Sequence, residues 1–268
     1  MSESNLTKGG MIILAVALIT ILSNTPCSAD DEVVYFSGQT GWLFNADLSN
    51  ITNVGGSYEP GTTASDLDMK NSSMYGAKLG IYSRRGILGL ETEIFRTTPD
   101  VKRQRQTFHE PTFGPFVARQ GYDVSVTTWA VNLLARVPLS ERMALHVGAG
   151  PAYFWGRIRD SVDTPRGGAQ RSNRLGLNTQ VGINYFFTPN VGLSAEWKYN
   201  HARFHFPEDP NEHGFRARYN AHLVAASIGY YFDVALPWKL PRAVRLRDIL
   251  GLPTSWLQPG GRNLPPSD

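Results

Sequence analysis

Hydrophobic and polar residues alternate with a period of two along most of the chain, and this alternation predicts β-strands. No stretch between Glu32 and the C-terminal tail keeps a convincing helical period. The pattern predicts eight strands, at residues 33–47, 74–84, 86–97, 123–137, 143–158, 174–187, 191–204 and 219–232. We therefore expect an all-β fold.

The connections between the predicted strands alternate in length. Long polar connections rich in Gly, Pro, Asn and Asp occupy residues 48–73, 98–122, 159–173 and 205–218, and tight turns occupy 84–86, 138–142 and 188–190. Outer-membrane barrels alternate in this way, with long loops outside the cell and short turns in the periplasm. We therefore predict an eight-stranded antiparallel up-and-down transmembrane β-barrel over residues 30–232.

The two faces of the predicted strands differ in polarity. Leu175, Leu177 and Val181 share one face of the sixth strand, and Asn178 and Gln180 share the other. Alternation alone fits a membrane barrel or a soluble barrel with an apolar interior, so the aromatic residues provide a second criterion. They fall in two bands on the apolar face, which is the girdle pattern of membrane barrels. The outer band is Trp42, Phe44, Trp129, Tyr153, Trp155, Trp197 and Tyr199, and the periplasmic band is Phe36, Tyr185, Phe187, Tyr230 and Phe232.

An apolar segment near the N-terminus has the length of a signal-peptide core. Residues 11–22 are apolar except for Thr20, whereas a transmembrane helix needs about 20 apolar residues. Small residues at 27–29 form a cleavage site, so we expect residues 1–29 to be a signal peptide. An uncleaved anchor and a lipoprotein attached through Cys27 are the alternatives.

Composition and charge narrow the class further. The mean hydropathy of −0.26 is too polar for a helical membrane protein, but it suits a barrel in which every second residue faces lipid. The formal net charge of +3 comes without a dense basic run, which argues against a nucleic-acid partner. Cys27 is the only cysteine and lies in the predicted signal peptide, so neither a disulfide nor a cysteine metal site is expected.

Residues 233–268 contain six prolines and predict a Pro-rich periplasmic C-terminal tail. A short amphipathic helix at 243–250, lying on the inner surface of the membrane, is the alternative for this segment.

Strand parity directs several charged side chains into the interior of the predicted barrel. An eight-stranded barrel is just wide enough to be filled by side chains, and an unpaired buried charge is costly. We therefore predict a paired lumenal charge network that plugs the barrel, with re-pairing that opens a narrow water or ion path as the alternative. The predicted members are Lys78, Glu91, Glu93, Arg136, Arg174, Glu196 and Lys198.

Three segments resemble the outer-membrane β-barrel domain family, the OmpA/OmpX-like small barrels often called porin family proteins. They are VGAGPAYF at 147–154, AEWKYNHARF at 195–204, and YNAH at 219–222 leading to IGYYF at 228–232. The resemblance covers residues 33–232 and implies an eight-stranded barrel in the outer membrane of a Gram-negative bacterium. It implies outer-membrane lipid, lipopolysaccharide and the barrel-assembly machinery as partners, and we expect a monomer.

The resemblance leaves the activity open, because fold does not determine function. The leading hypothesis is a non-enzymatic barrel with a structural or surface-interaction role, and the second is a small low-conductance pore. The third is a lipid-modifying enzyme, since some small barrels deacylate lipid A with a His and a Ser two residues later. Here Arg203 takes that second position after His201, and a nucleophile needs a hydroxyl or thiol beside its base. We expect no catalytic site.

No metal or cofactor is indicated either, because the histidine spacing fits no compact ligand motif. Lys102, Arg103 and Arg105 make the second long loop basic. On the outer face these charges are either solvated or in contact with lipopolysaccharide phosphates.

Overall fold

The computed structural model describes residues 32–53, 59–83, 87–160, 169–207 and 214–234. The predictions for residues 1–29 and for the tail lie outside these ranges, except that the last strand continues through Asp233 to Val234. Within the described ranges, no helix is both long enough and apolar enough to cross a membrane.

The strands are β1 (Glu32–Asn53), β2 (Thr63–Ala64), β3 (Leu67–Asp68), β4 (Ser72–Ser83), β5 (Leu88–Thr97), β6 (Gln104–Glu110), β7 (Gly114–Gln120), β8 (Tyr122–Pro138), β9 (Met143–Asp160), β10 (Gln170–Phe186), β11 (Val191–Phe206) and β12 (Phe215–Val234).

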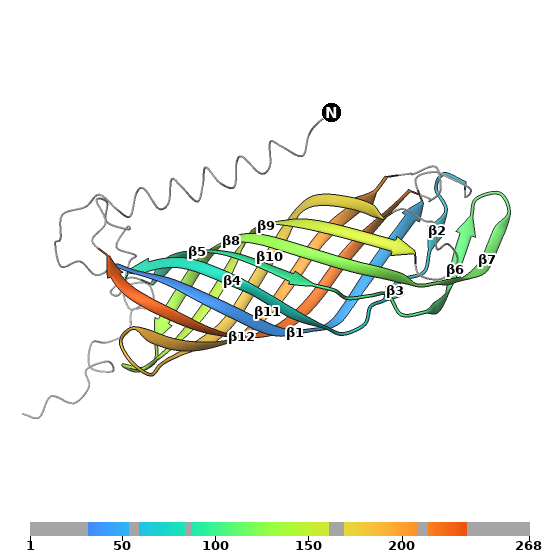
Figure 1. Cartoon of the computed structure of the whole chain (residues 1–268). Helices are drawn as coiled ribbons and strands as arrows, with labels where there is room; N and C mark the ends of the chain where they lie inside the picture. The colour runs from blue at the N-terminus through green and yellow to red at the C-terminus, as the bar shows by residue number, and fades with distance from the viewer. Residues whose placement is uncertain (1–31, 54–58, 84–86, 161–168, 208–213, 235–268) are drawn as a thin grey trace, which may run out of the picture.

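Eight of these strands close an antiparallel barrel (Figure 1). The order around the ring is β1, β4, β5, β8, β9, β10, β11 and β12, and β12 pairs back onto β1 from Glu32↔Val234 to Asn53↔Phe215. Each ring strand is antiparallel to the next, which confirms the predicted up-and-down topology. Closure leaves no free edge within the membrane, where an unpaired backbone group has no water to bond with.

Most ring strands extend further than predicted at their outer ends, although β5 ends at Thr97 as predicted. β1 has 22 residues, although about 9–11 tilted residues are enough to cross a bilayer. The outward aromatic side chains Phe36 and Trp42 are 57% and 53% exposed, and together with Phe44 they span a segment of that length. The rest of β1 and the corresponding ends of β8–β12 therefore form an extension of the barrel beyond the segment that is predicted to cross the membrane.

Two of the predicted long loops contain strands. β2 and β3 pair with the outer part of β1, β6 pairs with β2, and β7 completes a hairpin with β6. Figure 1 shows this hairpin beyond the mouth of the barrel. Phe108 and Phe116 stack across it with ring centroids 5.0 Å apart. The extension of β1 offers the pairing partner for these segments, and local alternation alone does not reveal it.

Apolar side chains of the barrel wall point outward, and polar side chains point inward. Leu133, Leu175 and Ile228 point outward and are 58%, 70% and 60% exposed. Asn132 and Asn178 point inward and are fully buried. A contiguous belt of exposed large apolar side chains marks a lipid or protein contact surface. The predicted outward direction of the apolar face is confirmed.

Candidate functional site

The interior of the barrel is filled in three layers, with a charged layer between two apolar ones. The outer layer lies in the extension and includes Leu43, Met74, Phe95, Phe154, Phe204, Phe206, Tyr219 and Leu223. The periplasmic layer consists of Val33, Tyr35, Tyr82 and Tyr231, with Phe186 packed against it.

Lys198 and Glu93 form the centre of the charged layer. The Lys198 Nζ lies 2.6 Å from Glu93 Oε2, and both side chains are completely buried. Lys198 also donates to Gln180 Oε1 at 2.8 Å. Glu93 accepts from Gln39 Nε2 at 3.1 Å and from Asn132 Nδ2 at 3.2 Å. Both ions therefore have the additional hydrogen bonds that a buried pair needs to offset desolvation.

Glu196 joins this pair to a second cation. The Lys78 Nζ lies 2.5 Å from Glu196 Oε2 and 3.6 Å from Glu91 Oε2. The Lys198 Nζ lies 3.1 Å from the same Glu196 oxygen. The His146 Nε2 lies 3.3 Å from Glu196 Oε1. The three carboxylates and two ammonium groups sum to one negative charge.

Strand register and small residues create the space for this layer. Lys78 lies opposite Glu93 across β4 and β5, and Gly182 lies opposite Glu196 across β10 and β11. A Cβ added at Gly182 would come within 2.6 Å of Glu196 Cγ and 2.7 Å of His146 Cε1. The glycine thus leaves room for two larger functional groups in a narrow barrel.

The periplasmic layer is hydrogen-bonded to the charged layer. The Tyr35 hydroxyl donates to Glu91 Oε2 at 2.5 Å, and Gln180 Nε2 donates to Glu91 Oε1 at 2.6 Å. The Tyr35 ring stacks on Tyr231 with centroids 5.1 Å apart. Glu91 is therefore held by neutral donors as well as by Lys78.

The structure brings together five of the seven predicted lumenal charges, namely Lys78, Glu91, Glu93, Glu196 and Lys198. It also adds His146, Tyr35 and Gln180, which were not singled out from the sequence. Their inward parity was a usable signal, because His146 alternates with the outward-facing Leu145 and Val147.

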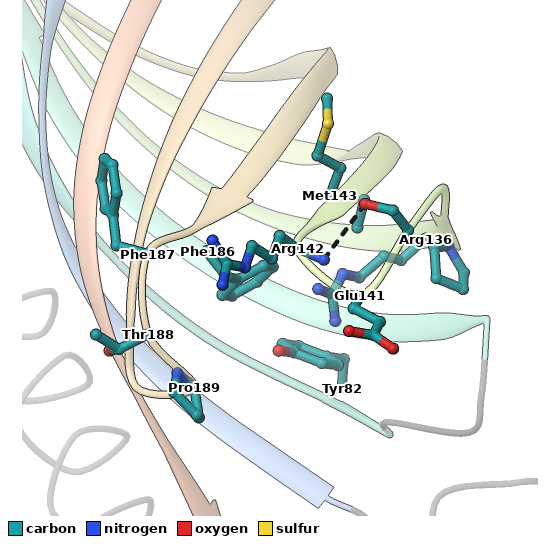
Figure 2. Close-up of a pocket in the computed structure, with 12 residues that line it drawn as sticks. Tyr82, Arg136, Glu141, Arg142, Met143, Phe186, Phe187, Thr188 and Pro189 are labelled. Carbon is teal, nitrogen blue, oxygen red and sulfur yellow. Dashed lines mark hydrogen bonds between the residues drawn. The ribbon is translucent and has the colours of Figure 1, made fainter.

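Arg136 is not a member of the network, which corrects the prediction. Its guanidinium carbon lies 4.0 Å from the centroid of Tyr82 and 5.2 Å from that of Phe186. Figure 2 shows it at the periplasmic mouth, beside Tyr82 and Glu141, in a pocket of about 520 Å³. Among the described residues no carboxylate forms an ion pair with it. Aromatic faces stabilise the cation there instead.

Arg174 is also outside the network, because its side chain is exposed. Its register partner on β9 is Phe154, which is completely buried. The barrel interior at this level is occupied by the outer apolar layer and offers the guanidinium no carboxylate. Pairing of β10 with β11 stops at Gly176↔Ala202, so Arg174 lies beyond the paired segment and reaches solvent.

The cavity beside the charged layer is very small. It measures about 20 Å³ and is bordered by Lys78, Glu91, His146 and Glu196 among others. A single water molecule needs about this much space. The charged side chains themselves are at most 3% exposed, so the described interior has no continuous water path at this level.

Comparison with known sequences agrees with this architecture. A family profile described as an outer membrane protein beta-barrel domain matches residues 14–232. The chain belongs to this family. It is a protein of the bacterial outer membrane. No curated protein sequence matches it.

Solved structures with a similar fold are small outer-membrane barrels. OprG from Pseudomonas aeruginosa is 15% identical with a TM-score of 0.51, covering 77% of this chain and 99% of OprG. Neisserial surface protein A is 13% identical with a TM-score of 0.45, covering 75% and 97%. The outer membrane protease OmpT from Escherichia coli is 12% identical with a TM-score of 0.42, covering 78% and 99%. At such identities the likeness to OprG concerns the fold alone, and no role is transferred to this family member.

Proposed function

We propose that the protein is a closed, non-enzymatic outer-membrane barrel with a structural or surface-interaction role. The observation that carries this proposal is the fully buried Lys198–Glu93 pair, which joins β11 to β5 across the interior. The two residues are 105 positions apart in the chain. A charge pair in this place both cross-links opposite walls and fills the lumen.

A pore would require more than a rearrangement of the charged layer. On its outer side that layer is covered by the apolar cluster, in which Phe154 and Tyr219 are at most 1% exposed. The periplasmic pocket and the small cavity share Tyr82 and Arg136, so the small cavity adjoins the periplasmic mouth. Opening a through-path therefore requires loss of close-packed aromatic contacts as well as re-pairing of ions.

Single-channel recording in planar bilayers tests this proposal. The wild-type barrel and Lys78→Ala should both show near-zero conductance, because the outer apolar layer is intact in both. Arg136→Ala is the matched variant at the periplasmic mouth and should also be silent. Discrete conductance steps in the wild-type protein would overturn the proposal in favour of the low-conductance pore.

An enzymatic role lacks support at the place where the sequence invites it. The His201 Nδ1 lies 2.8 Å from Asn220 Oδ1, which also accepts from the Tyr199 hydroxyl at 3.1 Å. Arg203 is exposed and provides no nucleophile. Lipid A from a deletion strain and lipid A from the same strain complemented with the gene should give identical profiles by mass spectrometry. A difference that the His201→Gln variant fails to reverse would revive the lipid-modifying enzyme.

A further inference from the structure

Four consecutive strands carry arginines on the outer surface, just beyond the outer aromatic band. Arg157 on β9 lies directly opposite Arg171 on β10. Arg203 on β11 lies directly opposite Arg218 on β12. All four side chains are exposed. Like charges directly opposite each other on neighbouring strands are destabilising, so two such pairs on one surface indicate a binding function for an anion.

The described part of the barrel does not pair these arginines with carboxylates. Within the described residues, no ion pair joins any of them to a carboxylate. Asp123 lies opposite Arg159. Asp123 and Asp100 line a pocket with Arg157, but neither of these described carboxylates forms an ion pair with it. Asp47 accepts a hydrogen bond from Asn220 Nδ2 at 2.9 Å.

His205 adds a hydrogen-bond acceptor rather than a further charge. The Arg216 Nε donates to His205 Nδ1 at 3.2 Å. Burial, together with the charges of Arg216 and Arg174, lowers the pKa of His205 from its ordinary value. The neutral imidazole orients Arg216, and within the described residues the other N–H donors of that guanidinium form no side-chain hydrogen bond.

An apolar surface lies directly on the membrane side of the arginines. Tyr153 and Trp155 precede Arg157 on the same outward face and pack edge to face at 4.8 Å. Leu175 and Trp197 on the next two strands are 70% and 40% exposed. The surface thus changes from cationic to apolar over a few residues, as the binding of an anionic lipid requires.

We propose that the arginine belt, defined as Arg157, Arg171, Arg203, Arg216 and Arg218, binds the phosphate groups of lipopolysaccharide. Guanidinium groups bind phosphate in a bidentate manner. Arg157 with Arg171, and Arg203 with Arg218, form two separate cationic pairs on the outer wall. Two pairs favour a glycolipid headgroup with several phosphates over a phospholipid with one. The acyl chains of the lipid then lie against the apolar surface below.

The belt, rather than the basic second loop, is the site. Lys102 and Arg103 are also exposed, but they lead into the β6–β7 hairpin beyond the barrel mouth (Figure 1). They belong to the connection between β5 and β6 rather than to a strand of the ring. The proposal is independent of whether the lumen conducts, so it can fail without affecting the proposed closed barrel.

Lipid binding to the folded full chain in detergent micelles tests the proposal. Bisphosphorylated lipid A should bind the wild-type barrel at least about tenfold more tightly than enzymatically dephosphorylated lipid A. The double variant Arg157→Gln/Arg171→Gln should lose about tenfold in affinity for the bisphosphorylated form. The control Lys102→Gln/Arg103→Gln removes the same charge and should bind like the wild type.

The melting temperature gives a second readout. Arginines with a purely structural role would not make the effect of the substitutions depend on lipid A. Without lipid A, the Arg157→Gln/Arg171→Gln barrel should melt at the same or a higher temperature, because repulsion is relieved. With lipid A, it should melt below the wild type. Equal binding of the two lipid A forms by the wild type would overturn the proposal, and so would equal competition by inorganic phosphate or phosphatidylglycerol vesicles.

Discussion

Replacement of Lys198 by Met is the sharpest perturbation of the barrel interior. The substitution keeps most of the side-chain volume and removes one of two ammonium groups. Glu93 then loses its cation at 2.6 Å and Glu196 loses one at 3.1 Å, and neither carboxylate has access to water. Removal of one partner from a buried ion pair costs about 3–5 kcal/mol, because an uncompensated charge stays buried.

A double variant that also removes the charge of Glu93 distinguishes the effect of charge imbalance from the effect of the changed side-chain shape. In Lys198→Met/Glu93→Gln, the charge lost at Lys198 is matched by one lost at Glu93. The new amide oxygen accepts from one of Gln39 and Asn132, and its NH2 group donates to the other once that amide turns its buried, unpartnered oxygen toward position 93. We expect this variant to recover most of the loss, with a coupling free energy of about 0.5–3 kcal/mol between the two positions.

Equilibrium unfolding in urea, followed by the heat-modifiable gel mobility of the folded barrel and by tryptophan fluorescence, measures these free energies. Lys102→Met removes an exposed lysine and should change stability by at most about 0.5 kcal/mol. A loss below about 1 kcal/mol for Lys198→Met, or strictly additive effects in the double variant, would refute the argument that the network is buried and coupled.

Two further predictions concern packing and the lipid-facing surface. Gly80→Ala should destabilise the barrel by about 1–3 kcal/mol in urea unfolding, because the Tyr35 ring and hydroxyl occupy the space of a Cβ. Gly38→Ala, with no atom within 4 Å of the added Cβ, should have little effect, and equal effects would contradict the packing argument. Leu133→Arg should cost about 2–4 kcal/mol in lipid vesicles, whereas Val117→Arg on the outer hairpin should be tolerated. The two side chains are 58% and 51% exposed, so only the surrounding medium distinguishes them, and similar losses would place Leu133 outside the bilayer.

The two missed arginines show where inference from the sequence stops. Parity correctly assigned Arg136 to the inner face, yet it lies on Tyr82 at the periplasmic mouth. Arg174 has inward parity but lies beyond the last β10–β11 pair, next to the buried Phe154. The parity of a residue in its strand determines whether its side chain points into the lumen. It gives no information on the height of that residue along the barrel axis. Height depends on the stagger between strands, which is a property of the closed ring.

The outer extension was missed for a related reason. Residues 104–120 form a hairpin because β2, held by the outer part of β1, offers an edge to β6. An isolated hairpin is marginally stable, and its local sequence shows Gly, Pro and charged residues that are typical of loops. The pairing becomes favourable only after β1 has closed the barrel.

The sequence by itself determined the features that depend on alternation along a strand: eight membrane strands, their up-and-down order, the lipid-facing side and the two aromatic bands. These are local properties, because every second residue meets the same medium. Only the tertiary structure decided that Lys198 meets Glu93 across the lumen, that the charged layer lies between two apolar layers, and that arginines pair across β9–β10 and across β11–β12. Each of these results joins residues from different strands, and ring closure and stagger set the heights at which they meet.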